Sequence, residues 1–158
     1  MNEKEVLENY VAEWSLRLPE LVKSVKKTDT EELEEKMILH FYETHLPLGS
    51  KRETKIFDDG YILLKKKPGL FAAKDGNFEP SYSSGILDPQ LLNEIIAISK
   101  ILDKEESCYE SMMDGYNSEL TIFNGESANS ITNYNCKLEN FSLSYRKLIM
   151  LIHNIKFL

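Results

Sequence analysis

The feature that most constrains the fold of this chain is a pair of glycine-containing turns, each set between stretches of strand-like residues. One turn, Asp58-Asp59-Gly60, separates residues 51–57 from residues 61–66. The other, Asn124-Gly125, lies between residues 117–123 and 127–134. Asp-Gly and Asn-Gly readily adopt the positive φ angles of tight hairpin turns. The sequence therefore predicts two hairpins and an antiparallel sheet.

Two further turns are predicted between the hairpins. Pro68-Gly69 and Asp75-Gly76 lead into short apolar stretches at residues 70–73 and 78–82. Proline cannot donate a backbone hydrogen bond to a neighbouring strand, so Pro80 predicts that the second of these strands is short or lies at an edge of the sheet.

Several other stretches have apolar residues at three- and four-residue intervals, which is typical of helices. The first stretch, residues 3–27, is interrupted by Pro19, and a second helix is expected from Thr28 to about Glu43. Asp88-Pro89 is a typical helix start. A short helical turn is expected through Met112, and a last helix from about Ser142.

These elements predict an α+β fold. The expected architecture is a mainly antiparallel sheet of about five to six strands with two N-terminal helices, one connecting helix and one C-terminal helix. The length of 158 residues is typical of one domain. We expect a single α+β domain over residues 1–158, with a helical N-terminal part (1–45) and a sheet-and-helix part (50–158).

Two cysteines, Cys108 and Cys136, are too few for a disulfide framework and match no zinc spacing, so we expect both to be small unpaired apolar residues. The residues after Met1 are charged rather than apolar, and the apolar stretch at residues 148–155 is too short to span a bilayer. The sequence predicts a cytoplasmic protein without a membrane segment.

Neither a catalytic site nor a metal or cofactor site is predicted. His40 and His45 flank Glu43, but on the expected helix a spacing of five residues would rotate them about 140° apart. His153 is expected to pack on the last helix. One alternative stays open, namely a site assembled from distant segments that brings His40, His45 or Cys136 together with carboxylates.

The formal net charge of −7 disfavours nucleic acid as a partner, because phosphate binding needs concentrated Lys and Arg. Residues 75–126 are strongly acidic, whereas residues 44–74 carry more bases than acids. A basic strip has two interpretations: it protects an exposed sheet edge, which we favour, or it binds phosphate or an acidic partner. It consists of Lys51, Arg52, Lys55 and Lys65–Lys67.

The acidic stretch also contains interleaved Tyr and Met residues, which are enriched at protein interfaces. Fixed negative charge speeds the encounter with a basic protein. We therefore predict a partner-binding surface for a protein with a basic surface, in which Tyr109 and Tyr116 serve as anchors. The predicted set is Asp103, Glu105, Glu106, Tyr109, Glu110, Asp114, Tyr116 and Glu119.

Residues 114–125 and 133–141 resemble a group of small bacterial α+β proteins, many of them uncharacterised, in which a Gly-led hairpin precedes an Asn-rich start of the final helix. Leu138 stands where those proteins often have proline. In size, acidity and lack of catalytic motifs the chain also resembles immunity proteins of bacterial toxin systems. This resemblance implies a non-enzymatic inhibitor, immunity or antitoxin-like, that neutralises another protein; the alternative is a small enzyme or ligand-binding regulator.

Overall fold

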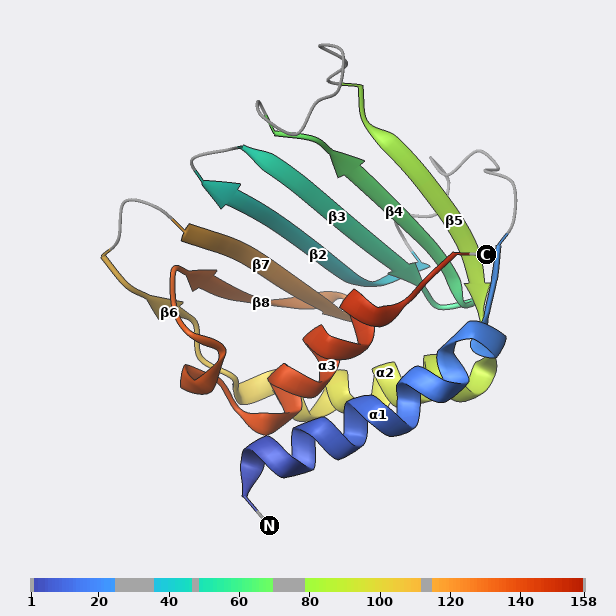
Figure 1. Ribbon diagram of the computed structural model, residues 1–158, viewed down its shortest axis with the longest axis horizontal. Helices are drawn as coiled ribbons and strands as arrows, with labels where there is room; N and C mark the ends of the chain where they lie inside the picture. Colours follow the sequence, from blue (N-terminus) through green and yellow to red (C-terminus); the bar gives the residue numbers. More distant parts are fainter. Residues whose placement is uncertain (1, 25–35, 47–48, 70–78, 112–114, 158) are drawn as a thin grey trace.

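The computed structural model describes residues 2–24, 36–46, 49–69, 79–111 and 115–157. Strands form one sheet, and helices lie along one of its faces (Figure 1). In chain order the elements are α1 (Glu3–Leu21), β1 (Val22–Ser24), β2 (Met37–Leu46), β3 (Ser50–Phe57), β4 (Tyr61–Lys67), β5 (Ser81–Leu87), α2 (Pro89–Ile101), the 3₁₀ turn η3 (Leu102–Lys104), β6 (Cys108–Tyr109), β7 (Gly115–Asn124), β8 (Ser127–Tyr134), the 3₁₀ turn η4 (Leu138–Asn140) and α3 (Leu143–Asn154).

The strand order of the sheet is β1-β5-β4-β3-β2-β7-β8-β6. Every neighbouring pair is antiparallel except β6 and β8, so the sheet is mixed. The prediction of five to six strands and two N-terminal helices is therefore wrong in detail: the described residues form eight strands and three α-helices. The two predicted hairpins, β3–β4 and β7–β8, are confirmed.

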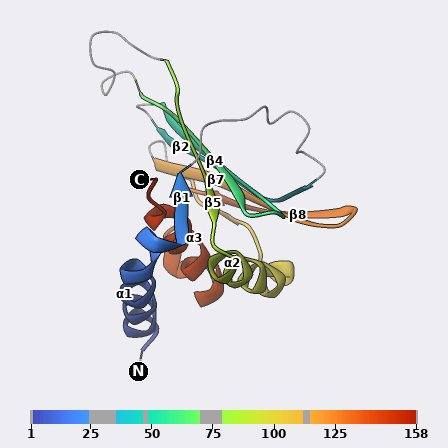
Figure 2. The same cartoon turned by 90° about the vertical axis from the view of Figure 1, so that its right-hand side faces the viewer.

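The three α-helices lie on the same side of the sheet, as the edge-on view shows (Figure 2). Between the helices and the sheet is the main apolar core, to which β2 contributes Leu39 and Phe41, both fully buried. We call the opposite face of the sheet the far face. No helix among the described residues lies on the far face, and none is long and apolar enough to cross a membrane.

Polar side chains cap each α-helix where the sequence places them. The side chain of Asn2 accepts a hydrogen bond from the amide of Glu5, and Asp88 accepts one from Gln90. Each contact satisfies a free amide in the first turn of its helix. Pro19 lies inside α1, which ends at Leu21 rather than near residue 27 because the chain enters β1.

The second predicted N-terminal helix is wrong where the structure describes it. Residues 37–46 form β2, a central strand that pairs with β3 and β7. Leu39 and Phe41 face the core at the two-residue interval of a strand. The third inward position is the buried Glu43, and this carboxylate interrupts the apolar pattern that would have revealed the strand. Residues 28–35 lie outside the described residues.

Two smaller predictions also change. The helical turn expected before Met112 is instead the strand β6, and Met112 itself is outside the described residues. The strand expected at residues 78–82 begins at Ser81, extends to Leu87 and lies between β1 and β4, so it is not an edge strand. Pro80 just precedes it. The strand expected at residues 70–73 falls outside the described part of the chain.

The register of the strands fixes which side chains are neighbours on the far face. Residues directly opposite one another across the sheet project from the same face. One row across the far face consists of Tyr109, Tyr134, Asn117, Thr44, Lys51 and Lys67. The next row consists of Thr132, Glu119, Tyr42, Glu53, Lys65 and Tyr82.

Candidate partner-binding surface and buried polar cluster

Two tyrosines lie side by side at the β6 end of the sheet. Tyr109 of β6 is in register with Tyr134 of β8, and their exposed fractions are 70% and 43%. Tyrosine combines a large apolar ring with a polar hydroxyl, a combination enriched at protein interfaces. Tyr109 belonged to the predicted set and Tyr134 did not, because a parallel pairing between distant segments leaves no local sequence pattern.

Three acidic residues of the predicted set lie near this tyrosine pair in the chain or in the sheet. Glu106 and Glu110 are exposed on either side of β6, and Glu119 is exposed on the far face in the row next to Tyr134. With the two tyrosines these three acids form what we call the β6 surface. The structure thus brings together the part of the predicted set that lies closest to β6.

The other members of the predicted set lie elsewhere or have structural partners. A carboxylate oxygen of Asp103 accepts a hydrogen bond from Asn124 at 3.1 Å. Glu105 accepts a hydrogen bond from the amide of Ser142 at 2.7 Å, at the start of α3. The positive end of the helix dipole stabilises a carboxylate at this position. Tyr116 lies on the helix-covered face, and Asp114 is outside the described residues.

Cys108 and Cys136 form a disulfide, with their Cα atoms 6.1 Å apart. The prediction of two unpaired cysteines is therefore wrong. The bond joins β6 to the segment after β8, 28 residues later in the sequence. Two isolated cysteines gave no sign of this pairing, because it depends on the parallel alignment of β6 with β8.

Asn133 prepares the turn that carries Cys136. Its side chain is fully buried, accepts a hydrogen bond from the Cys136 amide at 2.8 Å and donates one to the Cys136 carbonyl at 3.2 Å. Asn135, between the tyrosine and the cysteine, has a φ of 64°, a left-handed conformation that Asn tolerates better than most residues. The role of this Asn-rich segment is therefore to shape the turn that carries Cys136.

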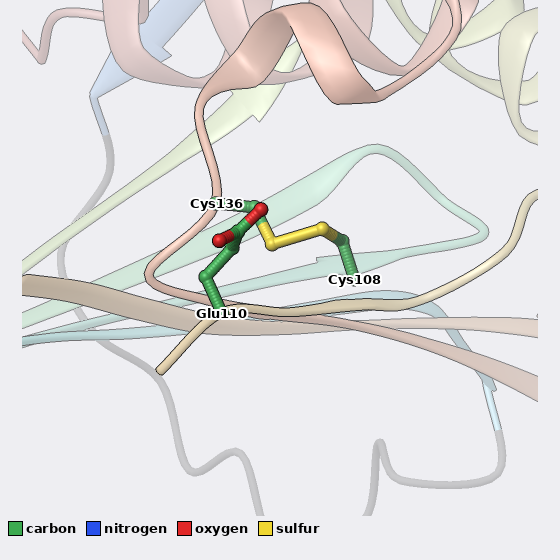
Figure 3. Close-up of side chains that lie close together, drawn as sticks. All are labelled: Cys108, Glu110 and Cys136. Atoms are coloured by element: carbon green, nitrogen blue, oxygen red, sulfur yellow. A yellow bond between two sulfur atoms is a disulfide. The ribbon is translucent and has the colours of Figure 1, made fainter. Parts of the chain in front are cut away.

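Glu110 lies beside the disulfide (Figure 3). One carboxylate oxygen and the two sulfur atoms lie within 4.8 Å of one another. This is a group that could hold a metal if both sulfurs were thiolates. In the disulfide each sulfur is bonded to the other, so the group as it stands here offers only the carboxylate.

A second polar group is buried under α3. Glu43 is only 2% exposed, and its Oε1 atom accepts a hydrogen bond from the Tyr116 hydroxyl at 2.6 Å and lies 2.6 Å from Nε2 of His153. Arg52 Nε is 3.8 Å from Oε2. We call these four residues the Glu43 cluster. They come from β2, β7, α3 and β3, so the cluster is assembled from distant segments. It contains His153, which was expected only to pack on the last helix, and not the His40, His45 or Cys136 of the open alternative.

The surroundings of the Glu43 cluster keep its tyrosine protonated. Burial first, and then the charge of Glu43, raise the pKa of Tyr116 well above its ordinary value. Burial likewise raises the pKa of the neighbouring Tyr145 to about 12, with Glu43 adding to the effect and the Ser118 hydroxyl opposing it. Tyr116 thus remains a hydrogen-bond donor to the carboxylate at neutral pH.

The remaining histidines lie apart from one another and from the disulfide. On the strand β2, His40 points to the far face, where its Nε2 atom is 3.1 Å from a carboxylate oxygen of Glu53. His45 lies on the other face with its ring 5.0 Å from that of Tyr116. The expected separation of the two histidines holds, although a strand rather than a helix produces it.

Comparison with known proteins gives no family for this chain: no protein-family model matches it, and neither does any curated protein.

Proposed function

We propose that this protein is a non-enzymatic inhibitor of the immunity or antitoxin type, which binds another protein and neutralises it. The observation that carries the proposal is the adjacent pair Tyr109 and Tyr134, both exposed, with the exposed acids Glu106 and Glu110 close to Tyr109 in the chain. Rigid aromatic side chains supply most of the binding energy at many interfaces. Surrounding carboxylates select a partner whose contact surface is basic.

The chain's overall charge supports the same class of partner. A net charge of −7 raises the rate of encounter with a basic protein at low ionic strength. When the bond between Cys108 and Cys136 is present, it joins β6, which has only two residues, to the segment after β8. A preformed surface loses little conformational entropy on binding.

Co-expression with the products of adjacent genes tests the proposal. A stable complex isolated by size-exclusion chromatography is the expected result, and its dissociation constant is then measured at several salt concentrations. Charge reversal at Glu106 and Glu110 is expected to weaken the complex and to flatten its salt dependence. The double change Glu8→Lys and Glu20→Lys, an equal change of charge at exposed positions on α1, is the matched control. Unchanged affinity and salt dependence in the β6 variant would rule out the acidic surface.

The Glu43 cluster favours the alternative function, a small enzyme or ligand-binding regulator. A buried carboxylate, a histidine and a tyrosine in contact are groups used in proton transfer. The side chain of His153 is 34% exposed, so a ligand could reach it from solvent. Under this alternative, binding of the ligand shifts the NMR signals of the His153 ring, whereas the inhibitor proposal predicts no such shift when the partner binds.

A cytoplasmic location belongs to the same proposal, and the disulfide tests it. Cytosolic proteins generally keep their cysteines reduced, whereas disulfides persist in oxidising compartments. Alkylation of thiols in freshly lysed cells, followed by mass spectrometry, reports the state of Cys108 and Cys136. Thiols in both positions support the cytoplasm, and a bonded pair would place the protein in an oxidising compartment.

A further inference from the structure

A pocket of about 190 Å³ opens on the far face, where Tyr42 in its lining lies directly opposite Glu119 of the β6 surface. Its lining comes from three adjacent strands, β2, β3 and β4. A cavity of about 150 Å³ is large enough to hold benzene, so this pocket has room for a small ligand. The lining residues are Tyr42, Lys51, Glu53, Lys65 and Lys67.

Among the described lining residues of the pocket, positive charges outnumber negative ones. Lys51 and Lys67 face each other directly across β3 and β4, and like charges in that position destabilise a sheet. Glu53, directly opposite Lys65, is the one acid among the described lining residues. Its two carboxylate oxygens lie 3.1 Å from His40 and 3.9 Å from Lys55. Within the described part of the chain, none of the three pocket lysines forms an ion pair, and the Lys65 ammonium lies 5.8 Å from the centre of the Tyr82 ring.

Edge protection does not explain these lysines. In that role, lysines lie on an outer strand and keep other chains from adding to the sheet. β3 and β4 are interior strands here, with β2 and β5 on their outer sides. The favoured interpretation of the lysines from sequence is therefore wrong for β3 and β4, which leaves the other one, binding of phosphate or of an acidic partner.

We propose that this pocket binds a small soluble molecule through a diphosphate group. The ammonium groups of Lys51, Lys65 and Lys67 supply the charge, and the Tyr42 hydroxyl can donate a hydrogen bond to a phosphate oxygen. Three cations around one small pocket suit two adjacent phosphate groups better than one. Bound phosphate also removes the repulsion between Lys51 and Lys67.

Isothermal titration calorimetry of the full chain with inorganic pyrophosphate at low ionic strength tests the proposal. Pyrophosphate is expected to bind more tightly than orthophosphate, and Lys51→Gln and Lys67→Gln are each expected to weaken it about tenfold. Lys66→Gln is the matched control, because Lys66 is exposed on the same strand but alternates to the other face of the sheet. ADP in place of pyrophosphate shows whether a nucleoside adds affinity.

Three results would overturn the proposal: no binding of pyrophosphate or ADP at low salt, unchanged affinity in both Lys51→Gln and Lys67→Gln, or an equal loss in Lys66→Gln, which would indicate a general charge effect. The pocket lining lies on β2, β3 and β4, and Tyr109 on β6 is not part of it. Tyr109→Ala is therefore expected to leave pyrophosphate affinity unchanged.

Discussion

Cys108 is bonded to Cys136, and this bond fastens the two-residue strand β6 to the turn that follows β8. The position of Tyr109 depends on it, because Tyr109 directly follows Cys108 and pairs with Tyr134. So short a strand has few backbone hydrogen bonds of its own. The disulfide therefore connects the stability of the fold with the shape of the proposed partner-binding surface.

Replacement of both cysteines by serine is expected to lower the free energy of unfolding by about 3 to 4 kcal/mol, the loop-closure contribution of a cross-link spanning 28 residues. Urea unfolding of the oxidised protein and of the variant measures the difference. In the variant, amide hydrogen exchange is expected to speed up at Glu110, whose amide donates to the Tyr134 carbonyl. Equal exchange at that amide in both proteins would show that β6 stays in place without the bond.

Loss of the buried carboxylate in the Glu43 cluster is expected to cost more than loss of a surface acid. Glu43→Ala leaves the Tyr116 hydroxyl without its acceptor and Arg52 without its counter-charge, at a cost of about 3 kcal/mol. Glu20→Ala, an exposed change on α1, serves as control and is expected to alter stability by less than about 0.5 kcal/mol. Similar values for the two variants would mean that the cluster does not hold α3 against the sheet.

Alkaline pH is expected to destabilise the protein through its buried tyrosines. Burial raises the pKa of Tyr145 to about 12, and burial and nearby carboxylates raise the pKa values of Tyr10 and Tyr116. In the unfolded chain these hydroxyls ionise near pH 10. The folded protein therefore binds more protons than the unfolded chain above about pH 10, and stability is lost as pH rises toward about 12.

Urea unfolding at about pH 8 and about pH 11 measures that loss. Tyr116→Phe is the informative variant, because it removes one of the shifted groups while keeping the ring. Its stability is expected to be lower at about pH 8, owing to the lost hydrogen bond to Glu43, and to fall less steeply between the two pH values. A slope equal to that of the unmodified protein would contradict the assignment of Tyr116.

The parts of the fold that local signals specify are those that the sequence predicts well. Asn124-Gly125 fixes the β7–β8 hairpin, and the Asp88 cap fixes the start of α2. The strand β2 was mistaken for a helix because Glu43 occupies an inward position, where an apolar residue would have shown the two-residue alternation. In the fold, His153 and Tyr116 form hydrogen bonds with that buried carboxylate. They lie 110 and 73 residues away in the chain, so no local pattern predicts its burial.

The candidate surface was predicted only in part for the same reason. Tyr109 and its neighbouring acids could be selected from sequence because they lie together in one acidic stretch of the chain. Tyr134 and the disulfide depend on the parallel pairing of β6 with β8, a contact that no local pattern encodes. Tyr116 shows the opposite error. Its polar sequence neighbours predicted an exposed side chain, but its hydroxyl donates a hydrogen bond to the buried carboxylate of Glu43.

The most direct test of the central claim, that the β6 surface binds the partner protein, is the dissociation constant of the complex for the double variant Tyr109→Ala and Tyr134→Ala. The account predicts a rise of about 30-fold or more, as for interface hot spots. Tyr82→Ala, a half-exposed tyrosine at the other end of the far face, is predicted to leave the constant unchanged. A double variant that binds as tightly as the unmodified protein would contradict the claim.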